Sequence, residues 1–427
     1  MSDELARGGG RPRRRGEGPA ALPDEAGAAL DGEGHAALPG DAPAALGRPI
    51  DAPLPARPPL TTPRRLRGRA LLGRERELVR RQPWLGFAGL VVVVPLTVLL
   101  VVVAGGAESS LEVLAPLSTF ALPVVAMVAF WWEDWPGSSL TPGWSGIVNT
   151  AVVIVCTIGL TIAGQAVVGR ADLHSLFDGT PGPGHPATFP ATLPLAAIAF
   201  TVILQLTLVS EGWPLRGRLP RLWAGLAAVV VSWGIALLVY YLLAEIDPRA
   251  PDLATGLKSQ DGLVSGQSIG AWLISVALWQ SVVFIALRGW PVLSISVRGW
   301  RIAAGNALTI AGGWASYLVL REVFSVSLGS IAAALGCGVA ATLLAAMLME
   351  GWLGDKLHEA RWRVVAVCGV TTVTVVLYVV LKLIADGIDF HKAQASDWIL
   401  YAGLDAIGTA VILHVAIWRR WPVSGVR

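Results

Sequence analysis

Tryptophan residues divide the apolar part of this chain into five segments of similar length, and this spacing constrains the fold more than any other feature. Five tryptophans precede an apolar stretch, at Trp84, Trp144, Trp223, Trp300 and Trp362, and five follow one, at Trp135, Trp213, Trp290, Trp352 and Trp421. Nine or ten residues separate each closing tryptophan from the next opening one. Each segment holds two apolar runs, so the pattern predicts five helical hairpins that begin and end on the same side of a membrane.

Each of the ten apolar runs is about 20 residues long, the length that a helix needs to cross the hydrocarbon core. The runs occupy residues 85–104, 111–132, 146–168, 191–209, 222–244, 269–287, 302–320, 328–349, 364–384 and 398–418. They are continuous rather than alternating, and 54% of all residues are hydrophobic. Helices therefore satisfy the backbone in lipid better than a β-barrel would. We expect an all-α, polytopic membrane bundle of ten transmembrane helices.

The distribution of basic residues predicts the orientation. The loops on the side of the framing tryptophans hold twenty Lys and Arg residues, and the loops on the other side hold six. Cytoplasmic loops carry the excess of positive charge, so both termini are expected in the cytoplasm. Arg supplies 29 of the 33 basic residues and Ala, Gly and Val are abundant, which favours a GC-rich bacterial genome. The predicted location is the bacterial cytoplasmic membrane.

The chain before Trp84 divides into two parts, and residues 84–427 form the predicted membrane domain. Residues 1–62 are rich in Gly, Pro and Ala and contain no aromatic residue, which predicts a disordered cytoplasmic tail. Residues 63–83 contain eight Arg residues and a spacing of leucines typical of one helix face. This basic segment either lies on anionic lipid headgroups as an interfacial helix or acts as an ordinary positive-inside signal.

The tryptophan pattern itself has two interpretations. An aromatic belt places tryptophan at both membrane interfaces without any repeat. Here the opposite ends of the runs show only Trp272 and Trp398, so we favour repetition of one hairpin unit.

A charged residue stands two positions before each closing tryptophan. These residues are Glu133, Glu211, Arg288, Glu350 and Arg419. An acidic residue at a helix C-terminus faces the negative end of the helix dipole. We therefore expect the three glutamates to contact cations such as Arg288 and Arg419 in a cluster at the cytoplasmic helix ends. Alternatively, each side chain extends separately into the headgroup region.

One acidic residue lies well inside the last run. A charge at the position of Asp405 is costly in lipid unless it is compensated, and Lys382 stands near the end of the preceding run. We expect an intramembrane pair of these two residues, which either holds the hairpin together or binds an ion or proton. Gln165, Gln205 and Gln280 are expected to form interhelical hydrogen bonds.

No motif for catalysis, cofactor binding or metal binding is present. The three cysteines, Cys156, Cys337 and Cys368, lie separately in apolar runs, and a net charge of +3 gives no reason to expect a nucleic acid partner. Ten spans in repeated units without a soluble domain favour a transporter or permease for a small solute or lipid. Two alternatives stay open: a non-catalytic scaffold or sensor that recruits a cytoplasmic partner, and an enzyme that modifies lipid.

Overall fold

The computed structural model describes residues 81–178, 189–245, 261–350, 357–391 and 393–423. Each predicted hairpin has an opening helix followed by a closing helix. The opening helices are α2 (Trp84–Val102), α4 (Pro142–Val168), α6 (Arg221–Leu243), α8 (Arg298–Leu318) and α10 (Glu359–Ala385). The closing helices are α3 (Ala107–Ala126) with η1 (Met127–Trp131), α5 (Leu193–Leu204) with η4 (Gln205–Val209), α7 (Gly266–Ser281) with η5 (Val282–Ala286), and α9 (Leu328–Thr342) with η8 (Leu343–Leu348). The last closing helix consists of α11 (Ala395–Leu400), η9 (Tyr401–Ile407), α12 (Gly408–Ile412) and η10 (Leu413–Ile417).

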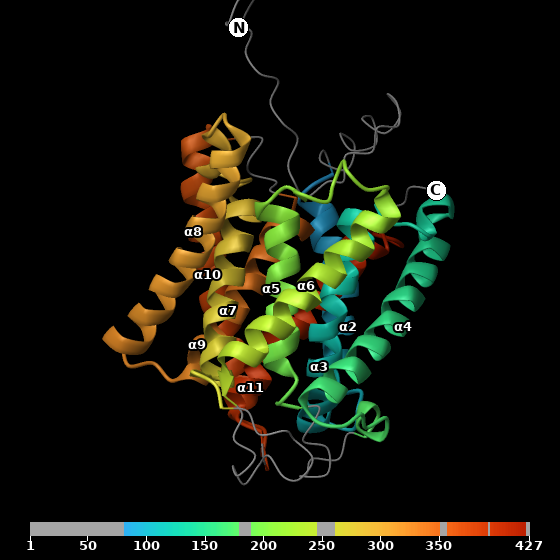
Figure 1. Cartoon of the computed structure of the whole chain (residues 1–427), viewed down its shortest axis with the longest axis vertical. Helices are drawn as coiled ribbons and strands as arrows, with labels where there is room; N and C mark the ends of the chain where they lie inside the picture. The colour runs from blue at the N-terminus through green and yellow to red at the C-terminus, as the bar shows by residue number, and fades with distance from the viewer. Residues whose placement is uncertain (1–80, 179–188, 246–260, 351–356, 392, 424–427) are drawn as a thin grey trace, which may run out of the picture. The chain divides into compact units, whose positions relative to one another are not determined.

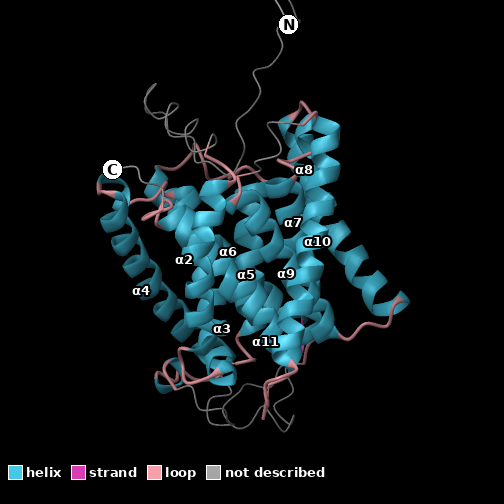
Figure 2. Cartoon of the chain, turned by 180° about the vertical axis from the view of Figure 1, so that it is seen from behind, coloured by secondary structure: helices cyan, strands magenta, loops and turns pink. Residues whose placement is uncertain are grey.

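Short elements complete the described chain. Three single 3₁₀ turns, η2 (Gly137–Ser139), η3 (His174–Leu176) and η6 (Val292–Ser294), lie in connections, and the π-helical η7 (Val319–Val323) extends α8. The strands β1 (Ala244–Glu245) and β2 (Val264–Ser265) pair in parallel. Figure 2 shows that long helices dominate and that the loops gather at their two ends.

Eight helices of the described chain are long and apolar enough to cross a membrane. The helix Leu193–Val209 is apolar but shorter, and α8 is not among the eight. The prediction of an all-α membrane protein is therefore confirmed, whereas the number of ten spans stays a prediction. The predicted tail of residues 1–62 and the basic segment up to residue 80 lie outside the described residues.

The closing helices form an inner ring. Contacts run from α3 to α5, from α5 to α7, from α7 to α9, and from α9 to α11 and η9, which in turn contact α3. The opening helices lie outside the ring, where α4, α6, α8 and α10 pack along the closing helix of the preceding hairpin and α2 packs along the last one. In Figure 1, α4 and α8 accordingly lie at opposite sides with α5 between them.

Burial separates the two sets of helices. Between 56 and 72% of the spanning residues are buried in α3, α7, α9 and the last closing helix, against 17 to 33% in α2, α4, α6 and α10. The opening helices therefore supply most of the surface that lipid would contact.

Each opening helix packs inward through one stripe of mostly small residues. In the first four hairpins the buried positions come one, five and nine residues after the opening tryptophan: Leu85, Gly89 and Val93; Ser145, Asn149 and Val153; Ala224, Ala228 and Ser232; Arg301, Gly305 and Thr309. A spacing of four keeps these residues on one helix face, and small side chains let helix backbones approach closely. The recurrence of the same positions supports the interpretation of a repeated hairpin unit.

The five closing helices also end alike. Each changes to π-helix in its last turn, and the charged residue that follows has a φ between +47° and +54° in every hairpin: Glu133, Glu211, Arg288, Glu350 and Arg419. In four hairpins the next residue donates its backbone N–H to a carbonyl six residues earlier, as from Asp134 to Val128. The Trp–Pro bond that follows is cis in the four hairpins with proline there. The predicted charged position is therefore a left-handed helix C-cap, one residue wider than the usual Schellman motif.

The end of each closing helix contacts the beginning of the opening helix two hairpins further along. The contacts are Trp132 Nε1 to Leu222 O at 3.0 Å, Glu211 to Arg301 at 2.6 Å, Arg363 over the Trp290 ring at 4.5 Å, Gln82 Nε2 to Leu348 O at 3.3 Å, and Trp418 Nε1 to Thr150 Oγ1 at 3.1 Å. Two hairpins beyond hairpin 4 the series begins again, so that hairpin 4 contacts hairpin 1 and hairpin 5 contacts hairpin 2. The helix ends therefore form a closed set of contacts on one face. This face carries the opening and closing tryptophans that the structure describes, and we call it the Trp-framed face.

Candidate functional site

Asp405 lies at the middle of the last closing helix, in the π-helical segment η9. It is the eleventh of the 23 residues of the span Ala395–Ile417 and is 5% exposed. Its polar contact within the described chain is with Thr119, whose Oγ1 lies 3.4 Å from Oδ1. The same hydroxyl donates to the carbonyl of Ala115 at 2.8 Å, and a hydroxyl has one proton to donate. The carboxyl group is therefore poorly compensated by its surroundings.

Lys382 has a different partner from the one expected. Its ammonium group lies 3.0 Å from both carboxylate oxygens of Asp386, and both side chains are about half exposed. The two residues are four apart at the end of α10, where a local pair forms easily and a long basic side chain extends to the interface. The structure thus does not bring Lys382 to Asp405.

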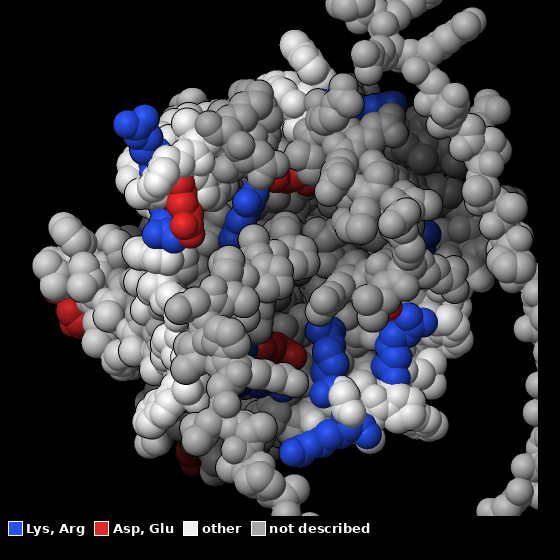
Figure 3. All heavy atoms as spheres, turned by 90° about the horizontal axis from the view of Figure 1, so that it is seen from above, with Lys and Arg blue, Asp and Glu red and all other residues white. Residues whose placement is uncertain are grey.

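The five charged C-cap residues have partners distributed over the Trp-framed face. Glu133 pairs with Arg221 at 2.9 Å, Glu211 with Arg301 at 2.6 Å and Arg298 at 3.5 Å, Glu350 with Arg420 at 2.7 Å, and Arg419 with Asp134 at 3.3 Å, while Arg288 lies 5.6 Å from the centre of the Trp362 ring. The glutamates thus contact cations, as expected, and these cations are Arg221, Arg298, Arg301 and Arg420. Figure 3, which views this face, shows basic and acidic groups at several separate places.

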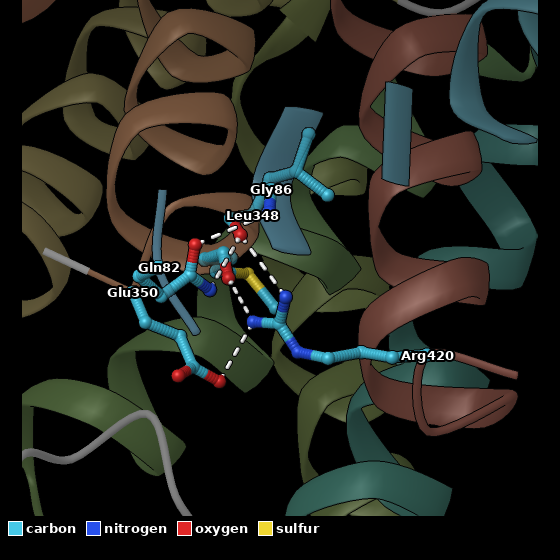
Figure 4. A network of polar contacts seen from close by, with 6 residues as sticks. Gln82, Gly86, Leu348, Glu350 and Arg420 are labelled. Atoms are coloured by element: carbon cyan, nitrogen blue, oxygen red, sulfur yellow. Dashed lines mark hydrogen bonds and ion pairs between the residues drawn. The ribbon is translucent and has the colours of Figure 1, made fainter. Parts of the chain in front are cut away.

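The most buried side chain of these pairs, Arg420, belongs to a network that joins three hairpins. Arg420 is 4% exposed in its side chain and donates to the carbonyls of Leu348 at 3.0 Å and Met347 at 2.8 Å as well as to Glu350. Gln82 reaches the same Leu348 carbonyl from the start of hairpin 1 (Figure 4). Burial lowers the pKa of the Arg420 guanidinium and Glu350 opposes this shift. The guanidinium therefore caps the free carbonyls at the end of η8.

A second polar cluster lies between α5, α7 and α8. The Nε2 of Gln205 donates to Asn306 at 3.0 Å and to Thr309 at 2.8 Å. Gln280 donates to Gln205 and to the carbonyl of Thr201. These bonds fit the predicted interhelical role of Gln205 and Gln280. Gln165 instead bonds to the loop after its own helix, through the Ser175 hydroxyl and the Asp172 N–H.

Sequence reasoning did not predict the burial of two titratable residues, His414 and Glu108. His414 in η10 is 2% exposed, and neither ring nitrogen has a hydrogen-bond partner in the described part of the chain. Glu108 at the start of α3 accepts the backbone N–H groups of His391 and Ala393. A histidine inside an apolar run is a signal that the sequence does carry, whereas the contacts of Glu108 depend on the folding of a distant loop.

The described residues contain no group of three His, Cys, Asp or Glu side chains placed to hold a metal ion. Comparisons with family models, with curated proteins and with solved structures find no match to this chain. The geometry of the buried polar residues is therefore the basis for any functional conclusion.

Proposed function

We propose that this protein is a transporter or permease of the bacterial cytoplasmic membrane that moves a small solute or lipid. The observation that carries the proposal is the carboxyl group of Asp405, which lies at mid-span, is 5% exposed and has Thr119 rather than a cation as its partner. An ionisable residue inside a span is expensive and typically marks an ion or substrate path.

A purely structural role would need a different environment for this carboxyl group. Structural pairs in membranes compensate a carboxylate with a cation or several donors. Lys382, the partner that the sequence predicted for Asp405, is paired with Asp386. Asp405 therefore retains hydrogen-bonding capacity that a solute, water or a proton would use.

The proposed topology has ten spans with the Trp-framed face in the cytoplasm. It rests on the excess of basic residues on that face and places the basic segment 63–83 against anionic lipid. Cysteine in place of Asp389, which is exposed between α10 and α11, should react with an impermeant thiol reagent outside the cell. Cysteine in place of Arg218, which is exposed on the Trp-framed face, should react only after permeabilisation. The reverse result would overturn the orientation.

A test of transport that needs no known solute is the access of water to Asp405. In a background in which Cys156, Cys337 and Cys368 are replaced by alanine, Thr119→Cys should react with a small charged thiol reagent, because a transport path must be hydrated at this depth. The matched control is Val155→Cys in α4, at similar depth but 70% exposed on the outside of the bundle, where lipid should prevent reaction.

The result distinguishes the proposal from its alternatives. A scaffold or sensor has no need of water at mid-span, so failure of Thr119→Cys to react would contradict transport and favour the scaffold. Equal reaction of both variants would also contradict it, because the reagent would then reach the lipid face without any path.

A further inference from the structure

The first and last spans meet in an antiparallel seam. We use this name for the contact of α2 with the last closing helix, which pack together through η9, α12 and η10. The hydroxyl of Tyr401 donates to the carbonyl of Leu100 at 2.7 Å. Nearer the Trp-framed face, Nε2 of His414 lies 3.1 Å from the position that a Cβ atom at Gly89 would take. These two contacts fix the register of the seam.

Polar atoms without a partner recur along this seam. The hydroxyl oxygens of Thr97 and Thr409 and both ring nitrogens of His414 are buried and lack a hydrogen-bond partner among the described residues. Thr97 is three residues before Leu100 on α2, so the antiparallel register places it level with Asp405. Thr409 lies between Asp405 and His414 on the other helix.

These atoms need hydrogen-bond partners that the described side chains do not supply. A neutral imidazole has one N–H donor and one acceptor nitrogen, and burying either without a partner is unfavourable. Water is small enough to meet both needs and ordinarily occupies such positions in proteins. The same argument applies to the two hydroxyl groups.

Near His414, charged groups come from the segments that follow η10 and η1 at the Trp-framed face. The residues of α2 and of α4, which packs on η10, include no Asp, Glu, Lys or Arg. Arg420 donates its backbone N–H to the carbonyl of His414, and its guanidinium is paired with Glu350. Where η1 meets η10, Asp134 pairs with Arg419. Both arginines near the imidazole thus have a carboxylate partner.

From this juxtaposition we propose that the seam is a hydrated proton path that connects Asp405 with the Trp-framed face, with His414 as its intermediate proton carrier. His414 takes a proton from a hydronium ion at that face, which becomes water, and the imidazole becomes imidazolium. It then releases a proton through water and the hydroxyl of Thr409 to the carboxylate of Asp405, which becomes a carboxylic acid, and the imidazole returns to its neutral form. Each step exchanges one bond to hydrogen for another, with no oxidation.

Distance requires water in this path. Nine residues separate Asp405 from His414, which corresponds to roughly 13 Å along a helix and exceeds the reach of a direct hydrogen bond. The inference rests on the proposed transport function for its biological purpose, since the proton would drive solute movement. The path itself is tested independently of any solute.

The experiment is infrared spectroscopy of the full chain in lipid bilayers. The C=O stretching band of a protonated carboxyl group shifts when its proton is exchanged for deuterium, and loss of the band in Asp405→Asn assigns it. After a change to D₂O buffer, the band of the unmodified protein should shift rapidly. His414→Leu, which keeps the side chain large but removes both nitrogens, should slow the exchange at least about tenfold, equivalent to about 1.4 kcal/mol in the barrier. The matched control is His358→Leu, because His358 is exposed at the start of α10.

Two results would overturn the proton path. One is exchange at the same rate in His414→Leu as in the unmodified protein, and the other is a band that fails to exchange in the unmodified protein. Should His414→Leu fail to fold, His414→Gln, which retains a donor and an acceptor, and Thr409→Val provide the comparison, with slower exchange expected in Thr409→Val. Labelling of Thr119→Cys without an effect of His414 would leave transport standing and reject this path alone.

Discussion

Replacement of Arg420 by methionine should destabilise the protein far more than the same replacement of Arg221. Both arginines pair with a glutamate at the C-cap of a closing helix. Their surroundings differ: the Arg420 side chain is 4% exposed, whereas Arg221 and Glu133 are 48% and 37% exposed. The comparison therefore sets a buried guanidinium against an exposed one at similar ion pairs.

The expected magnitudes follow from what each change leaves behind. Arg420→Met leaves the carbonyls of Met347 and Leu348 without their guanidinium donor and Glu350 without its cation. Two buried acceptors and one partly buried charge together should cost about 3 kcal/mol. Arg221→Met removes an exposed ion pair, which is worth about 0 to 1 kcal/mol.

The assay is reversible unfolding in mixed micelles with increasing SDS, followed by far-UV circular dichroism. Arg420→Lys keeps the charge but cannot bond to all three acceptors at once, and should lose an intermediate amount. Losses for Arg420→Met and Arg221→Met that agree within about 0.5 kcal/mol would refute the argument, because burial would then have no influence on the cost.

Three further outcomes are expected. Gly225→Ala should lower stability by about 1 to 3 kcal/mol, since its Cβ would lie 2.5 Å from the Trp132 indole, whereas Gly234→Ala on the same helix meets nothing within 4 Å and should be neutral or slightly stabilising in the same SDS titration. Asp405→Asn and Lys382→Met should have additive effects in a double-mutant cycle, because Lys382 bonds to Asp386; a coupling above about 0.5 kcal/mol would contradict this. Deletion of residues 1–62 should leave the melting temperature of the detergent-solubilised bundle unchanged, and a clear decrease would show that the tail packs on it.

The features that sequence predicted correctly are local ones. A continuous apolar run of about 20 residues has few solutions in lipid other than a helix. A charged residue at a fixed distance from each closing tryptophan indicated an equivalent position in every unit, and Glu133, Glu211, Arg288, Glu350 and Arg419 share one left-handed conformation. That this position is a C-cap was not predicted, because π-helical widening has no simple sequence signal.

The partners of these residues could not be predicted because they come from other hairpins. Glu211 pairs with Arg301 two hairpins away, and this offset depends on how the opening helices lie outside the ring. Lys382 was expected inside the bundle, yet 17% of α10 is buried, so its side chains mostly point outward. Closeness in the sequence therefore did not predict which side chains form ion pairs in the structure.

The seam differs from most other helix contacts because its two helices do not come from the same hairpin or from consecutive hairpins. Consecutive hairpins are connected by the backbone, so their contacts form between neighbours in sequence, whereas α2 and the last closing helix come from opposite ends of the membrane domain. The ring closes where α11 and η9 contact α3, and α2 packs beside this closure, with Tyr401 bonded to the Leu100 carbonyl on one side of Asp405 and Gln82 and Arg420 sharing the Leu348 carbonyl at the Trp-framed face. Asp405 and His414 both lie on the helix that makes this closure. Contacts that no covalent connection maintains can open at lower cost than those within a hairpin, so a protein that must admit water to a buried carboxyl group would place that group at this seam.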